Sequence, residues 1–96
     1  MFKYSDLDFY FRKNRTEATA FLSNGYAIAV IKKFDENDIE TGLNDICVLK
    51  HDENGLINLY DFKLENKSLT NLTENQVESI MFDISNLSPI ANYEND

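Results

Sequence analysis

An Asn-Gly dipeptide constrains the fold of this chain more than any other feature. Asn24-Gly25 separates Thr16–Leu22 from Tyr26–Lys33, two runs that are rich in β-branched or aromatic residues. Asn and Gly both tolerate a positive φ angle, so the pair is typical of a type I′ turn, whose twist matches that of two antiparallel strands. The sequence therefore predicts a β-hairpin with a type I′ turn at this position.

A second pair, Asn54-Gly55, predicts a second hairpin with arms at Asp45–Lys50 and Leu56–Leu64. Apolar and polar residues do not alternate cleanly along the later arm, which predicts a bulge there. Between the two hairpins, Phe34–Asn44 is polar and rich in carboxylates. We expect this segment to be a long exposed loop.

The strand predicted at Tyr26–Lys33 is apolar on both faces. Successive side chains of a strand point to opposite sides of a sheet. The two sets here are Tyr26, Ile28 and Val30 on one face, and Ala27, Ala29 and Ile31 on the other. We therefore expect a central strand that is covered on both sides.

A helix near the C-terminus is predicted by its start signal and its periodicity. Thr73 and Gln76 have the spacing of a capping box, and Glu74 is an anion in the first turn. Apolar residues then recur at spacings of three and four, at Val77, Ile80, Met81, Ile84 and Leu87. The run Asn86–Pro89 is expected to end the helix.

The length of 96 residues fits a single domain that spans residues 1–96, with a frayed tail at about residues 92–96. The predicted class is α+β, with an antiparallel sheet of about four to five strands and one C-terminal amphipathic helix packed on it. The aromatic N-terminal segment is predicted to contribute a strand that includes Leu7–Arg12, with a short helical turn as the alternative.

The net charge of −8 is divided unevenly along the chain. Residues 1–33 contain six Lys or Arg and three Asp or Glu, whereas residues 34–96 contain three and fourteen. This negative field repels nucleic acid, whose binding requires phosphate neutralisation, and it attracts basic protein surfaces. The basic cluster Arg12-Lys13-Arg15 is too small to bind nucleic acid against this negative field, and we expect a solvated turn there.

Candidate catalytic and metal sites fail on spacing. Cys47 and His51 would share a strand face but lie roughly 13 Å apart, too far for a nucleophile–base pair. We expect Cys47 to be a small core residue and His51 to be a solvated residue at a turn. A calcium loop that starts at Asp35 would need Gly and Glu where Glu40 and Ile46 stand. The sequence predicts no catalytic residue, no cofactor and no metal site.

Features of localisation favour the cytoplasm. Cys47 is the single cysteine and cannot form an internal disulfide, and no apolar run has the length of a signal peptide core or a membrane span. We expect a cytoplasmic protein with no membrane association.

Several short motifs between residues 22 and 87 resemble, in order and spacing, a group of small uncharacterised phage and prophage proteins. They are Leu22-Ser23-Asn24-Gly25-Tyr26-Ala27-Ile28, Val48-Leu49 with Gly55-Leu56, Tyr60-Asp61, and Leu72-Thr73-Glu74 with Val77. The chain departs from the group's pattern at Ala27, where glycine is usual, and in its acidic Phe34–Asn44 segment. The resemblance implies a viral or mobile-element origin and, by analogy, an inhibitor of host defence such as an anti-CRISPR protein.

Our leading hypothesis is a non-enzymatic inhibitor that acts in the bacterial host as a DNA mimic. It would present carboxylates to a basic, nucleic-acid-binding surface of a Cas effector. The residues expected to bind this partner are Asp35, Glu36, Asp38, Glu40, Asp45, Asp52 and Glu53. The alternatives are an accessory or structural phage protein that forms a homodimer through the aromatics of Phe2–Phe11, and a toxin-neutralising immunity protein.

Overall fold

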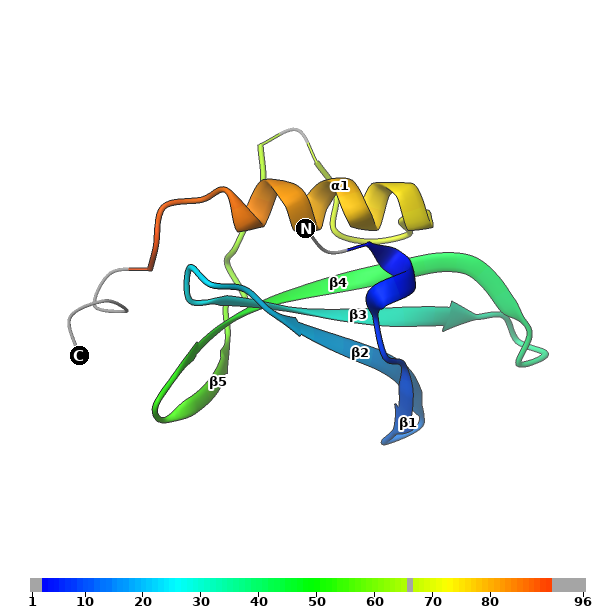
Figure 1. Ribbon diagram of the computed structural model, residues 1–96. Helices are drawn as coiled ribbons and strands as arrows, with labels where there is room; N and C mark the ends of the chain where they lie inside the picture. Colours follow the sequence, from blue (N-terminus) through cyan, green and yellow to red (C-terminus); the bar gives the residue numbers. More distant parts are fainter. Residues whose placement is uncertain (1–2, 66, 91–96) are drawn as a thin grey trace.

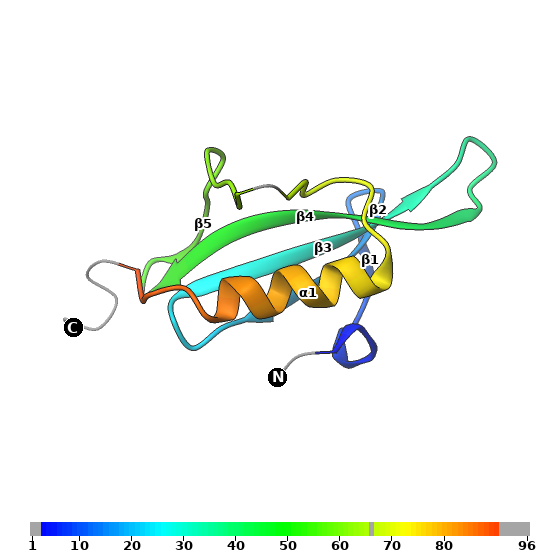
Figure 2. The same ribbon diagram turned by 90° about the horizontal axis from the view of Figure 1, so that it is seen from above.

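The alternating apolar runs form a five-stranded antiparallel sheet, and the helix lies across one face of it (Figures 1 and 2). A computed structural model describes residues 3–65 and 67–90. The strands follow one another in the sheet in their sequence order. The elements are the 3₁₀ turn η1 (Tyr4–Asp6), β1 (Tyr10–Arg12), β2 (Arg15–Phe21), β3 (Tyr26–Phe34), β4 (Glu40–Asp52), β5 (Gly55–Asn58) and the helix α1 (Glu74–Ser85).

The predicted hairpin of β2 and β3 is confirmed, but its turn is of another type. Asn24 does not have a positive φ, and Gly25 alone does, at 91°. The Gly25 amide donates to the Leu22 carbonyl at 3.4 Å, and the Leu22 amide donates to the Tyr26 carbonyl at 2.9 Å. These bonds close a three-residue loop that ends in a left-handed glycine, a geometry that also suits the twist of a hairpin.

A type I′ turn occurs instead between β1 and β2. Lys13 and Asn14 have φ values of 52° and 65°, and Arg12 pairs with Arg15 across the turn. The predicted N-terminal strand is thus present but shorter than Leu7–Arg12, and the helical-turn alternative occupies earlier residues, as η1. The helical turn and the strand therefore both occur in the N-terminal segment, with η1, which contacts α1, preceding β1.

The prediction of a long loop at Phe34–Asn44 is wrong. β3 extends to Phe34 and β4 begins at Glu40, and these two residues are paired across the ladder. The Thr41 hydroxyl donates to the Lys33 carbonyl at 2.9 Å and extends this pairing. A polar composition does not prevent strand pairing when both strands project into solvent, because the exposed side chains need no core.

The second predicted hairpin is confirmed as β4 and β5, although β5 ends at Asn58. The register from Leu49↔Asn58 to Asp52↔Gly55 is unbroken, so the bulge predicted in this arm is wrong; the irregularity lies between Lys32 and Phe34. Beyond β5 the chain is irregular, yet it packs three apolar side chains against the core: Leu59, Phe62 and Leu64.

The core lies on one face of the sheet only, between the sheet and α1. Its buried members come from the β2–β3 turn, from β3 and β4, from the segment before the helix, and from the helix itself: Leu22, Ile28, Val30, Ile46, Val48, Leu72, Val77, Ile80, Met81 and Ile84. The expectation that β3 is covered on both sides is therefore wrong for the part of the chain that the structure describes. Ala27 and Ala29 are buried on the opposite face without a second layer, because they are small and their strand is central.

The helix follows its sequence signals closely. The Gln76 amide donates to the Thr73 hydroxyl at 3.3 Å, and the Gln76 side chain accepts from the Thr73 amide at 2.8 Å. This reciprocal capping box fixes the first turn, and the C-cap is Asn86. The tail predicted to fray, at about residues 92–96, lies outside the described residues.

Candidate protein-binding surface

The tip of the β3–β4 hairpin carries the densest part of the predicted acidic surface. Asp35 organises this tip, because its Oδ1 atom accepts hydrogen bonds from the amides of Asn37, at 2.8 Å, and Ile39, at 3.0 Å. The Asp38 amide in turn donates to the Asp35 carbonyl at 3.0 Å, and Asp38 has a φ of 61°. Asp35 is therefore a structural residue that fixes the loop, and its carboxylate is already engaged.

Glu36 and Asp38 are the two carboxylates that the tip presents to solvent. Both are exposed, and across residues 3–65 and 67–90 no lysine or arginine forms an ion pair with either. Two apolar side chains flank them, since Phe34 is 41% exposed and Ile39 is 60% exposed. The tip, which we define as residues 34–39, combines uncompensated negative charge with apolar contact area, and Figure 2 shows it projecting beyond the helix and the sheet.

Glu40 and Asp45 belonged to the predicted surface but have cationic partners. The Lys32 ammonium lies 2.8 Å from Glu40, and the Lys33 ammonium lies 3.6 Å from Asp45. The hydrogen bond to Glu40 raises the pKa of Lys32 above its ordinary value. Asp45 also accepts a hydrogen bond from the Asn71 amide at 2.9 Å. These two carboxylates therefore contribute less field to a partner than the tip does.

Asp52 and Glu53 lie at the turn between β4 and β5, at the other end of the long strand (Figure 1). The strand β4 has 13 residues, which at about 3.3 Å per residue spans roughly 40 Å. The seven predicted residues therefore do not form one contiguous face. The structure gathers Asp35, Glu36, Asp38 and Glu40 at one end and leaves Asp52 and Glu53 apart from them.

A cleft of about 710 Å³ lies beside the tip, between it and the β1–β2 turn. The residues that line it are Phe11, Asn14, Arg15, Thr16, Lys32, Phe34, Asp35 and Asp38. Phe11 is 72% exposed, so an aromatic ring is presented to solvent close to the acidic tip. The sequence predicted a turn at the basic cluster but not its type I′ hairpin geometry, so it did not indicate that Phe11 and Phe34 approach one surface.

The basic cluster is engaged within the protein. Arg12 and Arg15 lie 3.9 Å and 3.4 Å from the Glu17 carboxylate, which is itself buried. Lys13 occupies the turn, as the prediction of a solvated turn requires. Two of the three cations thus compensate a carboxylate of their own sheet.

Cys47 and His51 both lie on β4 and share the face opposite the helix. Cys47 is partly exposed, so the expectation that it is a core residue is wrong. The His51 Nε2 atom lies 3.1 Å from the Leu22 carbonyl oxygen, and its ring meets Phe21 edge-on at 5.3 Å. Within the described residues no three His, Cys, Asp or Glu side chains gather as metal ligands would.

No helix among the described residues has the length and apolarity needed to cross a membrane. Comparisons of the chain with protein-family models, curated proteins and solved structures found no match. The geometry of the hairpin tip therefore carries the functional argument.

Proposed function

We propose that this chain is a non-enzymatic inhibitor that binds a basic protein surface with the tip of its β3–β4 hairpin. The observation that carries the proposal is the pair Glu36 and Asp38, two exposed carboxylates without an ion-pair partner among the described residues, held on a loop that Asp35 fixes. A fixed loop loses little conformational entropy on binding, so its charges act at low cost.

Basic surfaces that bind nucleic acid are the class of partner that suits this tip best. Their Lys and Arg side chains are arranged to contact phosphates, and carboxylates on a narrow hairpin can replace phosphates in such a groove. Phe34 and Ile39 add apolar contact that nucleic acid backbone does not offer, which favours a protein-specific interface. The resemblance to phage proteins makes a Cas effector of a bacterial host the first partner to test.

The experiment is a pull-down from bacteria that express guide-loaded Cas effectors, with mass spectrometry of the bound proteins. The paired variant Glu36→Gln with Asp38→Asn removes both charges and keeps the shapes, and Asn tolerates the positive φ at position 38. We expect this variant to lose the partner, and we expect target DNA to compete with the wild type. Capture that DNA does not affect and that the variant retains would refute the proposal.

The matched control is Asp52→Asn with Glu53→Gln, which removes the same two charges at the far end of β4. The side-chain oxygen of Asp52 accepts from the Asn54 amide at 2.8 Å, and asparagine can preserve this bond. We expect the control to retain the partner. Equal loss in both variants would indicate a response to net charge rather than a site at the tip.

A homodimer is the second candidate, because the edge strand β1 exposes aromatic side chains. Phe11 is 72% exposed and Tyr10 is 44% exposed on this three-residue strand. An exposed edge can pair with a second copy of itself. Sedimentation equilibrium discriminates the candidates, since the inhibitor proposal requires only a monomer whereas the dimer requires a species of twice the mass that Phe11→Ser abolishes. A toxin-neutralising immunity protein would use the same tip and would be recognised by the toxin recovered in the pull-down.

A further inference from the structure

The outer edge of β2 is open over most of its length. β1 pairs only with Arg15, Thr16 and Glu17, and no other described segment pairs with the edge from Ala18 to Phe21. The opposite edge of the sheet is better covered, because β5 and the bridge from Asn44 to Leu72 both pair with β4. Among the described residues, the stretch from Ala18 to Phe21 is thus an accessible unpaired edge, in addition to the outer edges of the terminal strands β1 and β5.

The direction of the free backbone groups follows from the ladder. The Leu22 amide donates to the Tyr26 carbonyl, so Leu22 directs its backbone groups toward β3. Bonding direction alternates along an antiparallel strand, so Thr19 and Phe21 direct their amides and carbonyls outward. These four groups are the hydrogen-bonding template that an added strand would use.

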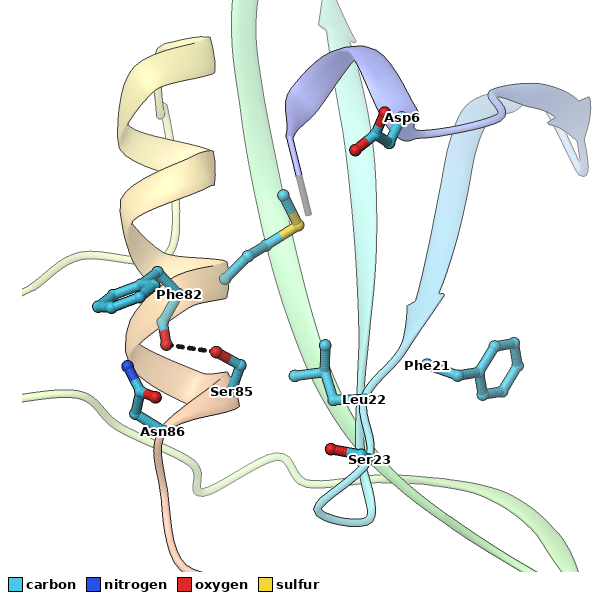
Figure 3. A pocket seen from close by; sticks show the side chains of 8 residues that line it. Asp6, Phe21, Leu22, Ser23, Phe82, Ser85 and Asn86 are labelled. Carbon is cyan, nitrogen blue, oxygen red and sulfur yellow. Dashed lines mark hydrogen bonds between the residues drawn. The ribbon is translucent and has the colours of Figure 1, made fainter. Parts of the chain in front are cut away.

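A groove of about 680 Å³ lies between this edge and the C-terminal half of α1 (Figure 3). Leu22 and Met81 supply apolar lining, and Phe82, which is 48% exposed, lines it from the helix. Figure 3 shows Asp6 across from the helix and the Phe21 ring directed away from it. A strand added to β2 would therefore place alternate side chains into the groove and the others beside Phe21.

The negative charge around the groove indicates which side chains an added strand would carry. Of the described residues that line the groove, only Asp6 has a charged side chain. Ser85 and Asn86 belong to the C-terminal end of α1, where the helix dipole is negative, and the last turn contains no basic residue. Glu78 precedes Met81 by three residues and Phe82 by four, so it lies on the same side of the helix. All of these features favour a cation in the groove.

We infer that the groove between β2 and α1 binds an extended, basic segment of a partner protein, which pairs with Thr19 and Phe21 as an additional strand. Apolar side chains of this segment contact Leu22 and Met81, and its Lys or Arg side chains lie near Asp6 at one end of the groove and near the end of the helix at the other. The site is separate from the hairpin tip, and its occupant can belong to the same partner or to another one.

The probe is a fluorescein-labelled peptide of about eight residues that alternates valine and arginine, long enough to span the open edge. We expect it to bind the full chain with saturation in fluorescence anisotropy, and to slow amide hydrogen exchange at Thr19 and Phe21 by at least about tenfold. A peptide that alternates valine and glutamate should bind at least about tenfold more weakly. An equally charged Val/Arg peptide with N-methylated amides should lose affinity to the same extent, because it cannot form the ladder.

Two helix variants locate the site. Ser85→Trp fills the groove and should abolish binding of the Val/Arg peptide, whereas Ser79→Trp, on another side of the same helix, should not change it. Both serines are exposed, so both variants are expected to fold. Asp6→Asn should weaken binding about threefold, a loss typical of one charge contact.

Three results would overturn the inference: equal binding of the N-methylated peptide, unchanged exchange at Thr19 and Phe21, or a wild-type dimer that Ser85→Trp dissociates. The last result would assign the groove to a second copy of the chain. The variant Glu36→Gln with Asp38→Asn should bind the peptide normally, so failure of the tip proposal and failure of this one are distinguishable.

Discussion

The side-chain amide of Asn24 donates a hydrogen bond to the carbonyl oxygen of Ile84 at 2.8 Å, and so joins the β2–β3 turn to the last turn of the helix. The same nitrogen also lies 3.2 Å from the Leu87 carbonyl, and the side-chain oxygen accepts from the Tyr26 amide. Asn24 is buried, and its side chain bonds the carbonyl of Ile84 in the last helical turn, which also accepts from the Leu87 amide, and the carbonyl of Leu87 just after the helix. One side chain therefore shapes the turn and also positions the helix on the sheet.

Substitution of Asn24 by alanine should destabilise the protein by about 2 kcal/mol. The change removes the side-chain donor to the Leu87 carbonyl and one donor to the Ile84 carbonyl, which keeps its bond from the Leu87 amide, and each lost hydrogen bond typically costs about 1 kcal/mol. Urea unfolding followed by circular dichroism measures the loss. The matched control is Asn54→Ala, which precedes the glycine of the other turn but is exposed, and it should change stability by less than about 0.5 kcal/mol. Equal losses at the two positions would show that the bond to the helix is unimportant.

Removal of the N-cap of α1 should lower the free energy of unfolding by less than Asn24→Ala does. Thr73→Ala deletes the hydroxyl that accepts from the Gln76 amide, and the loss of such an N-cap typically costs about 1 kcal/mol. Thr73→Ser keeps the hydroxyl and should stay close to the wild type in thermal unfolding. If serine destabilises as much as alanine, the methyl group of Thr73 and not its hydroxyl stabilises the start of the helix.

Truncation in the core should give the largest effect. Ile28 is fully buried between β2, β4 and the helix, and Ile28→Ala should destabilise by about 2–5 kcal/mol through lost burial and a residual cavity. Ile39→Ala removes the same atoms at the exposed tip and should be nearly neutral to stability. A small loss at Ile28 in urea unfolding would contradict the assignment of the core to the helix side of the sheet.

Stability should decline in alkali. Burial raises the pKa of Tyr4 above its ordinary value of 10.0, and the hydrogen bond to Glu40 raises the pKa of Lys32 above 10.5. Both groups bind their protons more tightly in the folded state than in the unfolded chain. Their contribution is therefore complete below about pH 10 and is lost as the pH rises through each folded-state pKa. Urea unfolding at a series of pH values tests this, and Tyr4→Phe should show a shallower decline above pH 10, although its phenyl ring no longer donates to Asn44.

The local signals in the sequence predicted the helix and most of the strands. The capping box at Thr73 and the spacing of Val77, Ile80 and Ile84 depend only on neighbouring residues, so they could be read directly. A solvated turn was expected at the basic cluster, but its type I′ geometry at Lys13 and Asn14 was not, because lysine has no preference for a positive φ. The end of β5 was missed because apolar residues such as Phe62 pack equally well from irregular chain.

The site could be predicted in part. The carboxylates of Phe34–Asn44 identified the acidic region, but composition does not reveal that Glu40 would pair with Lys32 across two strands, since this depends on register. Asp52 lies far from the tip because β4 is one continuous strand. This separation was not predicted, since the sequence analysis expected a loop up to Asn44. Asn44 is nearly fully buried, where it accepts from the Tyr4 hydroxyl and donates to the Leu72 carbonyl, and no local pattern indicated this role.

Site-specific photocrosslinking tests the central claim most directly. Benzoylphenylalanine at position 37, in the hairpin tip, is compared with the same residue at position 54, in the β4–β5 turn, in cells that express guide-loaded Cas effectors. Both positions are exposed asparagines in turns, so the two probes are matched. Binding through the tip predicts a covalent adduct with a basic partner from position 37 and none from position 54. An adduct from position 54 alone, or from neither position, would contradict it.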